Sequence, residues 1–504
     1  MQNKEVLMSI DEQEKRVAVL ENGKLEEFFL ERSSVAHLAG NIYKGKVAQV
    51  VKGMEAAFID IGLEKNGFLY VQELLPESLR SDEYAIENAD EAESADNAPK
   101  KANYEAKTID KLLTKGQDVL VQVVKEPFGT KGSRLTSQIS LPGRFLVLMP
   151  YSKNIGISKK ITNDKERQRL KALLKEIGLP KDMGCIMRTQ AQRMGKREFA
   201  RELKYLLRLW KTIKVKSSRR NAPCLIHEEY DLILRVARDF LNDDIKQVLI
   251  DKKEDYKRVM GFVQTLAPHL RRYISFYNEK MHLFEQHDAQ QQIEKIFAQK
   301  VSLKKGGYIV IERTEALVSI DVNSGSFINR GRLEETAFLT NLEAAKEIAR
   351  QIALKDLAGI IIIDFIDMQK SSHQKKVLSV LLKAMENDKA RFTVYPFSPL
   401  GIVQIARQRI RKNLDSLIFD KCVHCSGTGR IKSIQTIAIA VLRQIRGFLQ
   451  ANKRRHLKVK VHPKIAMRLL NEDRMTITNM EKKMWVKIAI ITDEHLGIEE
   501  VMFL

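Results

Sequence analysis

Two aspartates stand where apolar strands are expected to end. The stretch AGIIIIDFIDM carries Asp364 directly after four isoleucines, and the stretch ALVSID ends in Asp321. A carboxylate beside so much apolar bulk is costly to bury unless a partner compensates its charge. If the two strands are parallel neighbours, both carboxylates emerge at the same edge of the sheet, where open α/β sheets bind their ligands.

Carboxylates placed so close together favour a cation between them. Oxygen ligands suit Mg²⁺, which takes one or two carboxylates, keeps several waters and shares phosphate oxygens of a substrate. Asn323 could add an amide oxygen or orient a water, and Asp367 lies near enough to support the site. The pattern predicts metal-assisted phosphodiester hydrolysis. The plain alternative is that Asp364 and Asp367 are turn residues where a strand meets solvent.

A second candidate site is the run CVHCSGTG, which begins at Cys422 and has the spacing of a zinc knuckle. Zinc needs four ligands, and no second CxxC occurs; Cys185 and Cys224 suit small core positions. His424 could be a third ligand. Two chains that each supply Cys422 and Cys425 would complete one shared zinc site, which predicts a zinc-linked homodimer. A redox role is the weaker alternative, because no thioredoxin-like pattern surrounds the pair.

The amino-acid composition indicates which kind of partner the protein binds and in which cellular compartment it is expected. The chain has 504 residues, enough for roughly three or four domains. Lys and Arg number 86 against 64 Asp and Glu, and this net charge of +22 favours nucleic acid first and a membrane surface second. Scattered lysines that only aid solubility are the alternative. The lack of a signal peptide, of a stretch of roughly 20 apolar residues and of a disulfide framework predicts a cytoplasmic protein.

The elements that must position these residues can be read from local patterns. The first 30 residues alternate in polarity, and Asn22-Gly23 predicts a hairpin turn. Short glycine-broken strands from Ala39 onward predict a small β-barrel, interrupted by a disordered acidic loop at 81–99. Helices are expected over DKERQRLKALLKEI and GKREFARELKYLLRLWKTI.

The region from Gly306 to Met368 has the clearest organisation. Two strands joined by a turn at Arg313–Ala316 precede a helix expected over 334–357. The apolar strand GIIIID then predicts the middle of a sheet covered on both faces. Strand–helix–strand spacing predicts a parallel pair with a right-handed crossover.

Three of these motifs together resemble the ribonuclease E/G family: GGYIVIERTEALVSIDVNSG, EETAFLTNLEAAKEIARQIALKDLAGIIIIDFIDM and the C-x-x-C-x-G-x-G run. The resemblance covers nearly the whole chain, and its short C-terminal region is similar to that of the family's short form. It implies a multidomain α/β and β fold. The implied domains are an RNase H-like region (1–37 and 226–297) interrupted by an S1 (OB-type) barrel (38–137) and a 5′-sensor region (138–225), then a DNase I-like catalytic α/β domain (298–417), a zinc-link (418–430) and a small C-terminal α/β domain (431–504).

The same resemblance assigns roles to single residues. It implies catalysis and Mg²⁺ binding at Asp321 and Asp364 with Asn323 beside them, an intersubunit Zn²⁺ at Cys422 and Cys425, RNA contacts at Phe58, Phe68 and Lys131, and 5′-monophosphate sensing at Gly143, Val147, Arg188, Thr189 and Arg391. Without the resemblance, the two phenylalanines would be read as barrel core and Arg188 as an ordinary arginine at a strand end.

The implied activity is that of a Mg²⁺-dependent endoribonuclease that cleaves single-stranded, A/U-rich RNA. Its implied substrates are rRNA precursors and mRNA, its products carry 5′-phosphate and 3′-hydroxyl ends, and a 5′-monophosphate stimulates it. Assembly beyond a homodimer stays open, as does an effect of the acidic loop on RNA binding. The alternatives are a non-cleaving S1-type RNA-binding or scaffold protein and a nuclease that prefers DNA.

Overall fold

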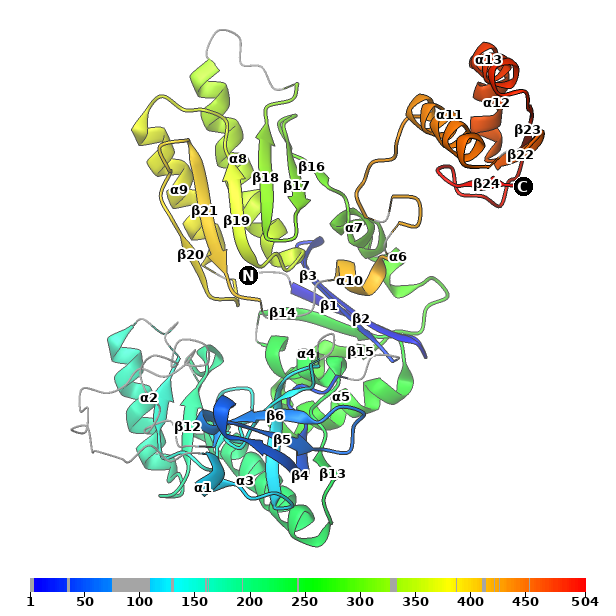
Figure 1. Ribbon diagram of the computed structural model, residues 1–504. Helices are drawn as coiled ribbons and strands as arrows, with labels where there is room; N and C mark the ends of the chain where they lie inside the picture. Colours follow the sequence, from blue (N-terminus) through cyan, green and yellow to red (C-terminus); the bar gives the residue numbers. More distant parts are fainter. Residues whose placement is uncertain are drawn as a thin grey trace. The chain divides into compact units, whose positions relative to one another are not determined.

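The protein is a multidomain α/β and β structure, seen in a computed structural model (Figure 1). The structure describes residues 4–33, 37–74, 109–127, 131–158, 161, 163–192, 194–242, 244–326, 333–386, 388–409, 414–420, 422–425, 427–452 and 454–504. The predicted acidic loop at 81–99 lies outside these residues. The chain divides into two compact units, Met1–Arg411 and Lys412–Leu504.

One five-stranded sheet combines the N-terminal strands with a much later segment. Its elements are β1 (Lys4–Ile10), β2 (Glu14–Glu21), β3 (Lys24–Arg32), α4 (Leu232–Phe240), β14 (Ile245–Ile250), α5 (Lys253–Leu266), β15 (Ile274–Phe276), α6 (Leu283–Gln286) and α7 (Ala289–Ile296). The strand order is β15-β14-β1-β2-β3, and β1 runs parallel to β14. Asn22 and Gly23 have φ angles of 52° and 74°, so the predicted hairpin turn is confirmed.

The predicted barrel is also present. It consists of β4 (Ile42–Val51), β5 (Ala56–Asp60), β6 (Gly67–Tyr70), β7 (Asp118–Lys125) and β8 (Arg134–Thr136), with the short helix α1 (Ile109–Leu112). Strand order β4-β5-β6-β8-β7 closes because β7 also pairs with β4, and β13 (Cys224–His227) adds to the outside of β4. Closure removes the free strand edges of this small sheet.

A four-stranded sheet with two helices follows the barrel. It contains β9 (Leu141–Pro142), β10 (Leu146–Met149), β11 (Ile155–Ile157) and β12 (Gly184–Met187), with α2 (Asp164–Ile177) and α3 (Lys196–Arg219). Asn163 caps α2 by accepting hydrogen bonds from the amides of Lys165 and Glu166, and Gly178 ends that helix with a left-handed φ of 75°. Both predicted helices are therefore confirmed.

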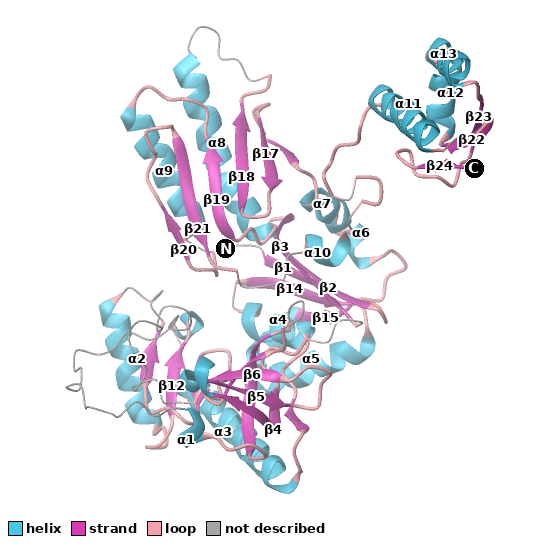
Figure 2. Cartoon of the chain, in the orientation of Figure 1, coloured by secondary structure: helices cyan, strands magenta, loops and turns pink. Residues whose placement is uncertain are grey.

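The region with the paired aspartates forms a six-stranded sheet with two long helices (Figure 2). It contains β16 (Lys300–Ser302), β17 (Tyr308–Arg313), β18 (Leu317–Asn323), α8 (Leu333–Leu354), β19 (Gly359–Asp364), α9 (Ser371–Met385), β20 (Phe392–Val394) and β21 (Ile402–Arg407). The order is β16-β17-β18-β19-β21-β20, and β18 is parallel to β19. The predicted strand–helix–strand unit is confirmed.

The expectation that both faces of this sheet are covered was wrong. Side chains of Val318, Ile320, Ile361 and Ile363 pack with α8 and α9 in one core, so both helices cover the same face. On the opposite face Ile360 is 55% exposed. Isoleucine is common in strands for its fit to a pleated surface, so an unbroken isoleucine run does not by itself require two covering layers.

The C-terminal unit is a separate small α/β domain. It contains α10 (Asp415–Ile418), α11 (Ile434–Ala451), β22 (His456–Val461), α12 (Pro463–Asn471), α13 (Arg474–Met484), β23 (Lys487–Thr492) and β24 (Val501–Phe503). The strand order is β23-β22-β24, and α11, α12 and α13 share a core with it. Among the residues described, no helix is long and apolar enough to cross a membrane.

Candidate functional site

Asp321 and Asp364 are direct partners in the register of the parallel strands β18 and β19. Adjacent strands lie about 4.8 Å apart, so the two side chains leave neighbouring backbones in the same direction. Because Ile320 and Ile363 point to the helices, both carboxylates point to the open face, and both are exposed. The predicted pairing at one sheet edge is confirmed.

Asn323 is held against the first of these carboxylates. Its Nδ2 donates a hydrogen bond of 2.7 Å to Asp321 Oδ2. The chain then turns at Gly325, whose φ is 56° and where an added Cβ would lie 2.4 Å from the carbonyl oxygen of Gly306. Only glycine fits this turn, which follows directly on the Asp–x–Asn segment.

The loop after Asp364 is fixed from helix α8. The buried Asn341 donates from Nδ2 to Ile366 O at 2.8 Å and accepts from Ile366 N at 3.1 Å. Glu334 accepts from the backbone amides of Gln369 and Lys370. Asp367 is exposed in this loop. Hydrogen bonds from a neighbouring helix therefore hold the segment that leaves the carboxylate edge.

The donor set fits a hard divalent ion. Two exposed carboxylates in register can supply the one or two protein ligands that Mg²⁺ requires, and the open face leaves room for waters and a phosphate. Within the described part of the chain, no group of three or more His, Cys, Asp or Glu side chains is arranged to hold a metal. The described residues therefore do not form the complete set of four protein ligands that a structural zinc site needs.

The barrel carries its aromatic residues on the outside. Ala57, Ile59 and Leu69 fill the interior, so the alternating Phe58 and Phe68 face outward, where they are half-buried. This overturns their reading as barrel core. Their rings meet edge to face with centroids 5.3 Å apart.

The structure extends this aromatic surface by residues that the sequence reading missed. Tyr70 is exposed and its ring lies 4.4 Å from that of Phe68, and the guanidinium of Arg134 lies over Tyr70 at 5.5 Å. Tyr70 follows Phe68 by two residues on one strand, and this spacing was the available signal. Lys131 is exposed, three residues before Arg134.

Four of the five residues implied in phosphate sensing lie around the β9–β12 sheet. Arg188 Nη1 donates to Gly143 O at 2.7 Å, Val147 pairs with Pro142 and Ile186 on neighbouring strands, and the exposed Thr189 directly follows Arg188. Arg391 lies elsewhere, exposed directly before β20 in the six-stranded sheet domain. A shared pocket that includes Arg391 stays a prediction.

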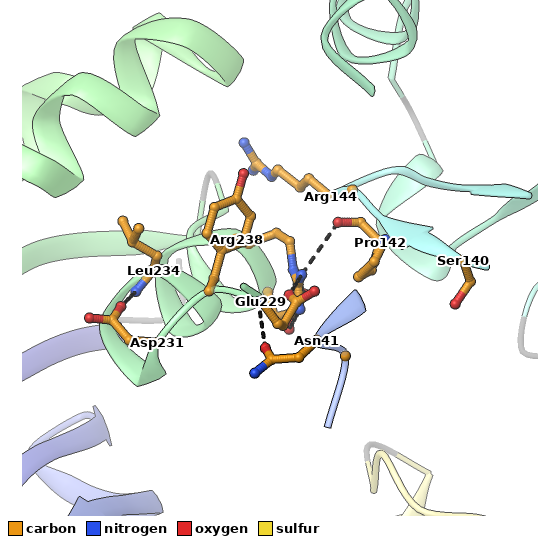
Figure 3. Close-up of polar contacts among 12 residues, drawn as sticks. Asn41, Ser140, Pro142, Arg144, Glu229, Asp231, Leu234 and Arg238 are labelled. Carbon is orange, nitrogen blue, oxygen red and sulfur yellow. Dashed lines mark hydrogen bonds and ion pairs between the residues drawn. The ribbon is translucent and has the colours of Figure 1, made fainter. Parts of the chain in front are cut away.

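A partly buried ionic network holds Arg188, and sequence reasoning gave no sign of it. Asp239 Oδ1 accepts from Arg188 Nη1 at 2.8 Å and from Arg238 Nε at 3.1 Å. Burial alone would raise the pKa of Asp239, but the charges of Arg238 and Arg188 outweigh it and hold that pKa below its usual value. Arg238 also bonds Glu229 and Pro142 O, and Glu229 N donates to Asn41 Oδ1 at the start of the barrel (Figure 3).

The cysteine pair forms a knuckle in the C-terminal unit. Gly429 N donates to Cys425 Sγ at 3.3 Å, and the amides of Gly429 and Gly427 together lower the pKa of that thiol. Cys422 is exposed. Backbone amides directed at sulfur suit a thiolate that binds zinc. Two thiols alone leave such a site incomplete. By contrast, burial raises the pKa of Cys185 to about 12, as expected for a core thiol.

Comparison with known proteins adds a family context. The model of the "Ribonuclease E/G family" matches residues 140–410, and that of the "RNase E/G, Thioredoxin-like domain" matches 421–503. The second match contradicts the expectation that nothing thioredoxin-like surrounds the cysteines. In the structure the pair nevertheless precedes the N-terminal residue of α11, Ile434, by nine residues or more, so it is not at that helix start.

Curated relatives match over most of the chain. Ribonuclease G of Haemophilus influenzae is 37% identical over 473 residues, 93% of this chain and 92% of that protein. Ribonuclease G of Escherichia coli K12 is 34% identical over 479 residues, 95% of this chain and 94% of that protein. Ribonuclease E of Escherichia coli K12 is 36% identical over 98% of this chain but only 45% of its own length.

Proposed function

The chain belongs to the ribonuclease E/G family, and we propose that it is a Mg²⁺-dependent endoribonuclease acting on single-stranded RNA. The observation that carries this proposal is the register pairing of Asp321 with Asp364 on the open face of the sheet. A bound Mg²⁺ supplies charge neutralisation at the scissile phosphate and lowers the pKa of a coordinated water. The products would carry 5′-phosphate and 3′-hydroxyl ends.

The chain's own residues have separate tasks in this proposal. Asp321 and Asp364 hold the ion, and the Asn323 amide fixes the orientation of the Asp321 carboxylate through its 2.7 Å hydrogen bond. Asn341 keeps the loop after Asp364 in place. These contacts form a preorganised edge, which reduces the reorganisation needed when a phosphate arrives.

RNA binding is proposed for the outer face of the barrel. Phe58, Phe68 and Tyr70 offer ring faces and edges to unpaired bases, and the exposed Lys131 offers positive charge to the backbone. Arg134, which lies over Tyr70, is paired with Glu73 at 3.1 Å. Stacking of this kind tolerates many sequences, so a preference for A/U-rich RNA rests on the family resemblance alone. Roles in rRNA maturation and mRNA decay, and a cytoplasmic location, are proposed on the same ground.

Stimulation by a 5′-monophosphate is proposed at Arg188. Both hydrogens of its Nη1 are used by Gly143 O and Asp239, which leaves the Nε–Nη2 edge for an anion. That edge matches a phosphate bidentately. Val147, Thr189 and Arg391 are proposed to complete the pocket.

Cys422 and Cys425 are proposed to share one Zn²⁺ with the same pair of a second copy, and assembly beyond that dimer is left open.

Cleavage of a short, end-labelled single-stranded RNA tests the function. Wild-type protein should cut it only with Mg²⁺, and Asp364→Asn or Asp321→Asn should bind the RNA but not cut it. Undiminished cleavage by both variants would refute this site. Binding without any cleavage by wild type would favour an S1-type scaffold protein, and equal cutting of single-stranded DNA of the same sequence would refute the RNA preference.

A further inference from the structure

Helix α3 carries a line of positive charges along its exposed side. These cations, which we call the α3 cation row, are Arg197, Arg201, Lys204, Arg208 and Lys211, and all five are exposed. Their spacing of four, three, four and three residues places them on one stripe of the helix. The row extends about 21 Å, at 1.5 Å per residue.

The opposite side of α3 is fixed in the core. Phe199, Leu206, Trp210 and Ile213 are buried among the strands and helix of the β9–β12 region. The helix therefore cannot rotate to hide its charged side, and the α3 cation row faces solvent as a fixed feature of the fold.

Acidic residues are scarce along the row, and the nearest ones lie at its start, where Glu176 pairs with Lys196. No acidic residue occurs from Leu203 to His227. Glu202 is only 2% exposed, and its carboxylate accepts hydrogen bonds from the backbone amides of residues 144–146. The remaining acid of the helix, Glu198, lies in its first turn. Among the residues that the structure describes, none of the ion pairs involves a member of the row.

Such a row opposes folding. Like charges three or four residues apart on a helix repel one another, and neutral residues with similar helix propensity would serve the exposed face equally well. A polyanionic partner would turn the repulsion into a favourable interaction.

A hollow of about 350 Å³ borders the row between α2 and α3. Lys204, Arg208 and Lys211 line one part of it, and Ile177, Leu203 and Leu207 line the apolar part. Figure 1 shows α2 and α3 in the lower part of the ribbon, in neighbouring colours between cyan and green. A partner that follows the row would thus contact a concave surface with cations at its border, where a sugar or base can cover the apolar part.

We propose that the α3 cation row binds the phosphate backbone of single-stranded RNA at a site separate from the carboxylate edge. This inference rests on the proposed function, because the partner is the RNA that the enzyme cleaves. A single strand is flexible enough to follow the row with successive phosphates while a nucleoside rests in the hollow. The row would hold the substrate beyond the segment that is cut.

Salt dependence of binding tests the proposal. The triple variant Arg201→Gln, Lys204→Gln, Arg208→Gln is compared with Lys375→Gln, Lys376→Gln, Lys383→Gln, which removes the same charge from exposed positions of α9. The dissociation constant of a single-stranded RNA with a 5′-hydroxyl is measured over a salt series without added Mg²⁺. Each phosphate contact contributes about −0.7 to the slope of log K against log salt, so loss of three contacts makes the slope shallower by about 2.

The outcomes are distinct. A shallower slope in the α3 variant with an unchanged slope in the α9 variant supports the row as a contact surface. Equal slopes in both variants overturn it, even when wild type cleaves RNA normally. Absence of RNA binding and cleavage by wild type would instead refute the proposed function. Glutamine keeps helix propensity and removes repulsion, so thermal unfolding should show both variants to be folded.

Discussion

Arg188 Nη1 and Asp239 Oδ1 lie 2.8 Å apart, although the two residues are 51 positions apart in the chain. Arg238 binds the same carboxylate and reaches Glu229, whose backbone amide is held by Asn41 of the barrel. The orientation of the arginine proposed to read the RNA 5′ end thus depends on a half-buried ion pair. A lone arginine would sample many rotamers before meeting a phosphate.

Asp239→Ala should therefore reduce the preference for 5′-monophosphate RNA over 5′-hydroxyl RNA. Without its carboxylate partner, Arg188 is no longer held with the Nε–Nη2 edge outward, and a misplacement of about 1 Å can cost up to about a hundredfold in rate. The measurement is the ratio of kcat/KM for the two RNAs, with Arg188→Gln as the reference for complete loss and Asp239→Glu as the conservative variant. A purely structural role would lower both rates and leave the ratio unchanged.

Tyr70→Ala should weaken binding of single-stranded RNA with little effect on folding. The exposed ring continues the Phe58–Phe68 surface, and stacking of one base on an aromatic side chain contributes about 1–3 kcal/mol. The dissociation constant should rise about 5- to 150-fold. Trp485→Ala, which removes an exposed aromatic ring from the C-terminal unit, is the control. Equal RNA affinities of the Tyr70→Ala and Trp485→Ala variants would refute a contact between the RNA and the Tyr70 ring.

Asn341→Leu should uncouple the loop after Asp364 from helix α8. The change removes two hydrogen bonds and leaves the backbone groups of Ile366 unpaired, which costs about 1–3 kcal/mol each when they stay buried. We expect a lower midpoint of urea unfolding and a fall in kcat, with RNA affinity retained. Thr340→Val is the matched control, because the buried Thr340 hydroxyl bonds only within its own helix.

Site residues could be predicted from the sequence where a local pattern places them together, but not where the contact joins residues far apart in the chain. Asp321 and Asp364 were predictable because each follows an apolar strand segment and one helix connects the two, which leaves a single parallel arrangement. Only Asp364 ends its strand, since β18 continues beyond Asp321 to Asn323. Tyr70 could have been found from the alternation that places it beside Phe68. The Arg188–Asp239 pair could not, because no local period links a strand end to a helix far along the chain.

The covering of the sheet shows a second limit. Four isoleucines at 360–363 fit a strand buried on both faces. Ile360 is nevertheless largely exposed, on the same open face as the Asp364 carboxylate. Burial is decided by which helices return to which side, and that depends on the crossover and on α9 rather than on strand composition. A one-sided sheet is what leaves Asp321 and Asp364 accessible to a substrate as large as RNA.

Replacing Cys422 and Cys425 with serine should remove zinc and shift the protein from dimer to monomer. Each knuckle offers two thiols, and the amides of Gly429 and Gly427 lower the pKa of Cys425, so the thiolate that zinc needs forms more readily than in an ordinary cysteine. Zinc content and solution mass are measured together, with Cys224→Ser as the control for loss of an unrelated thiol. A serine variant that stays dimeric without zinc would show that other surfaces hold the copies together. A wild-type protein that contains one zinc ion per monomer would refute sharing.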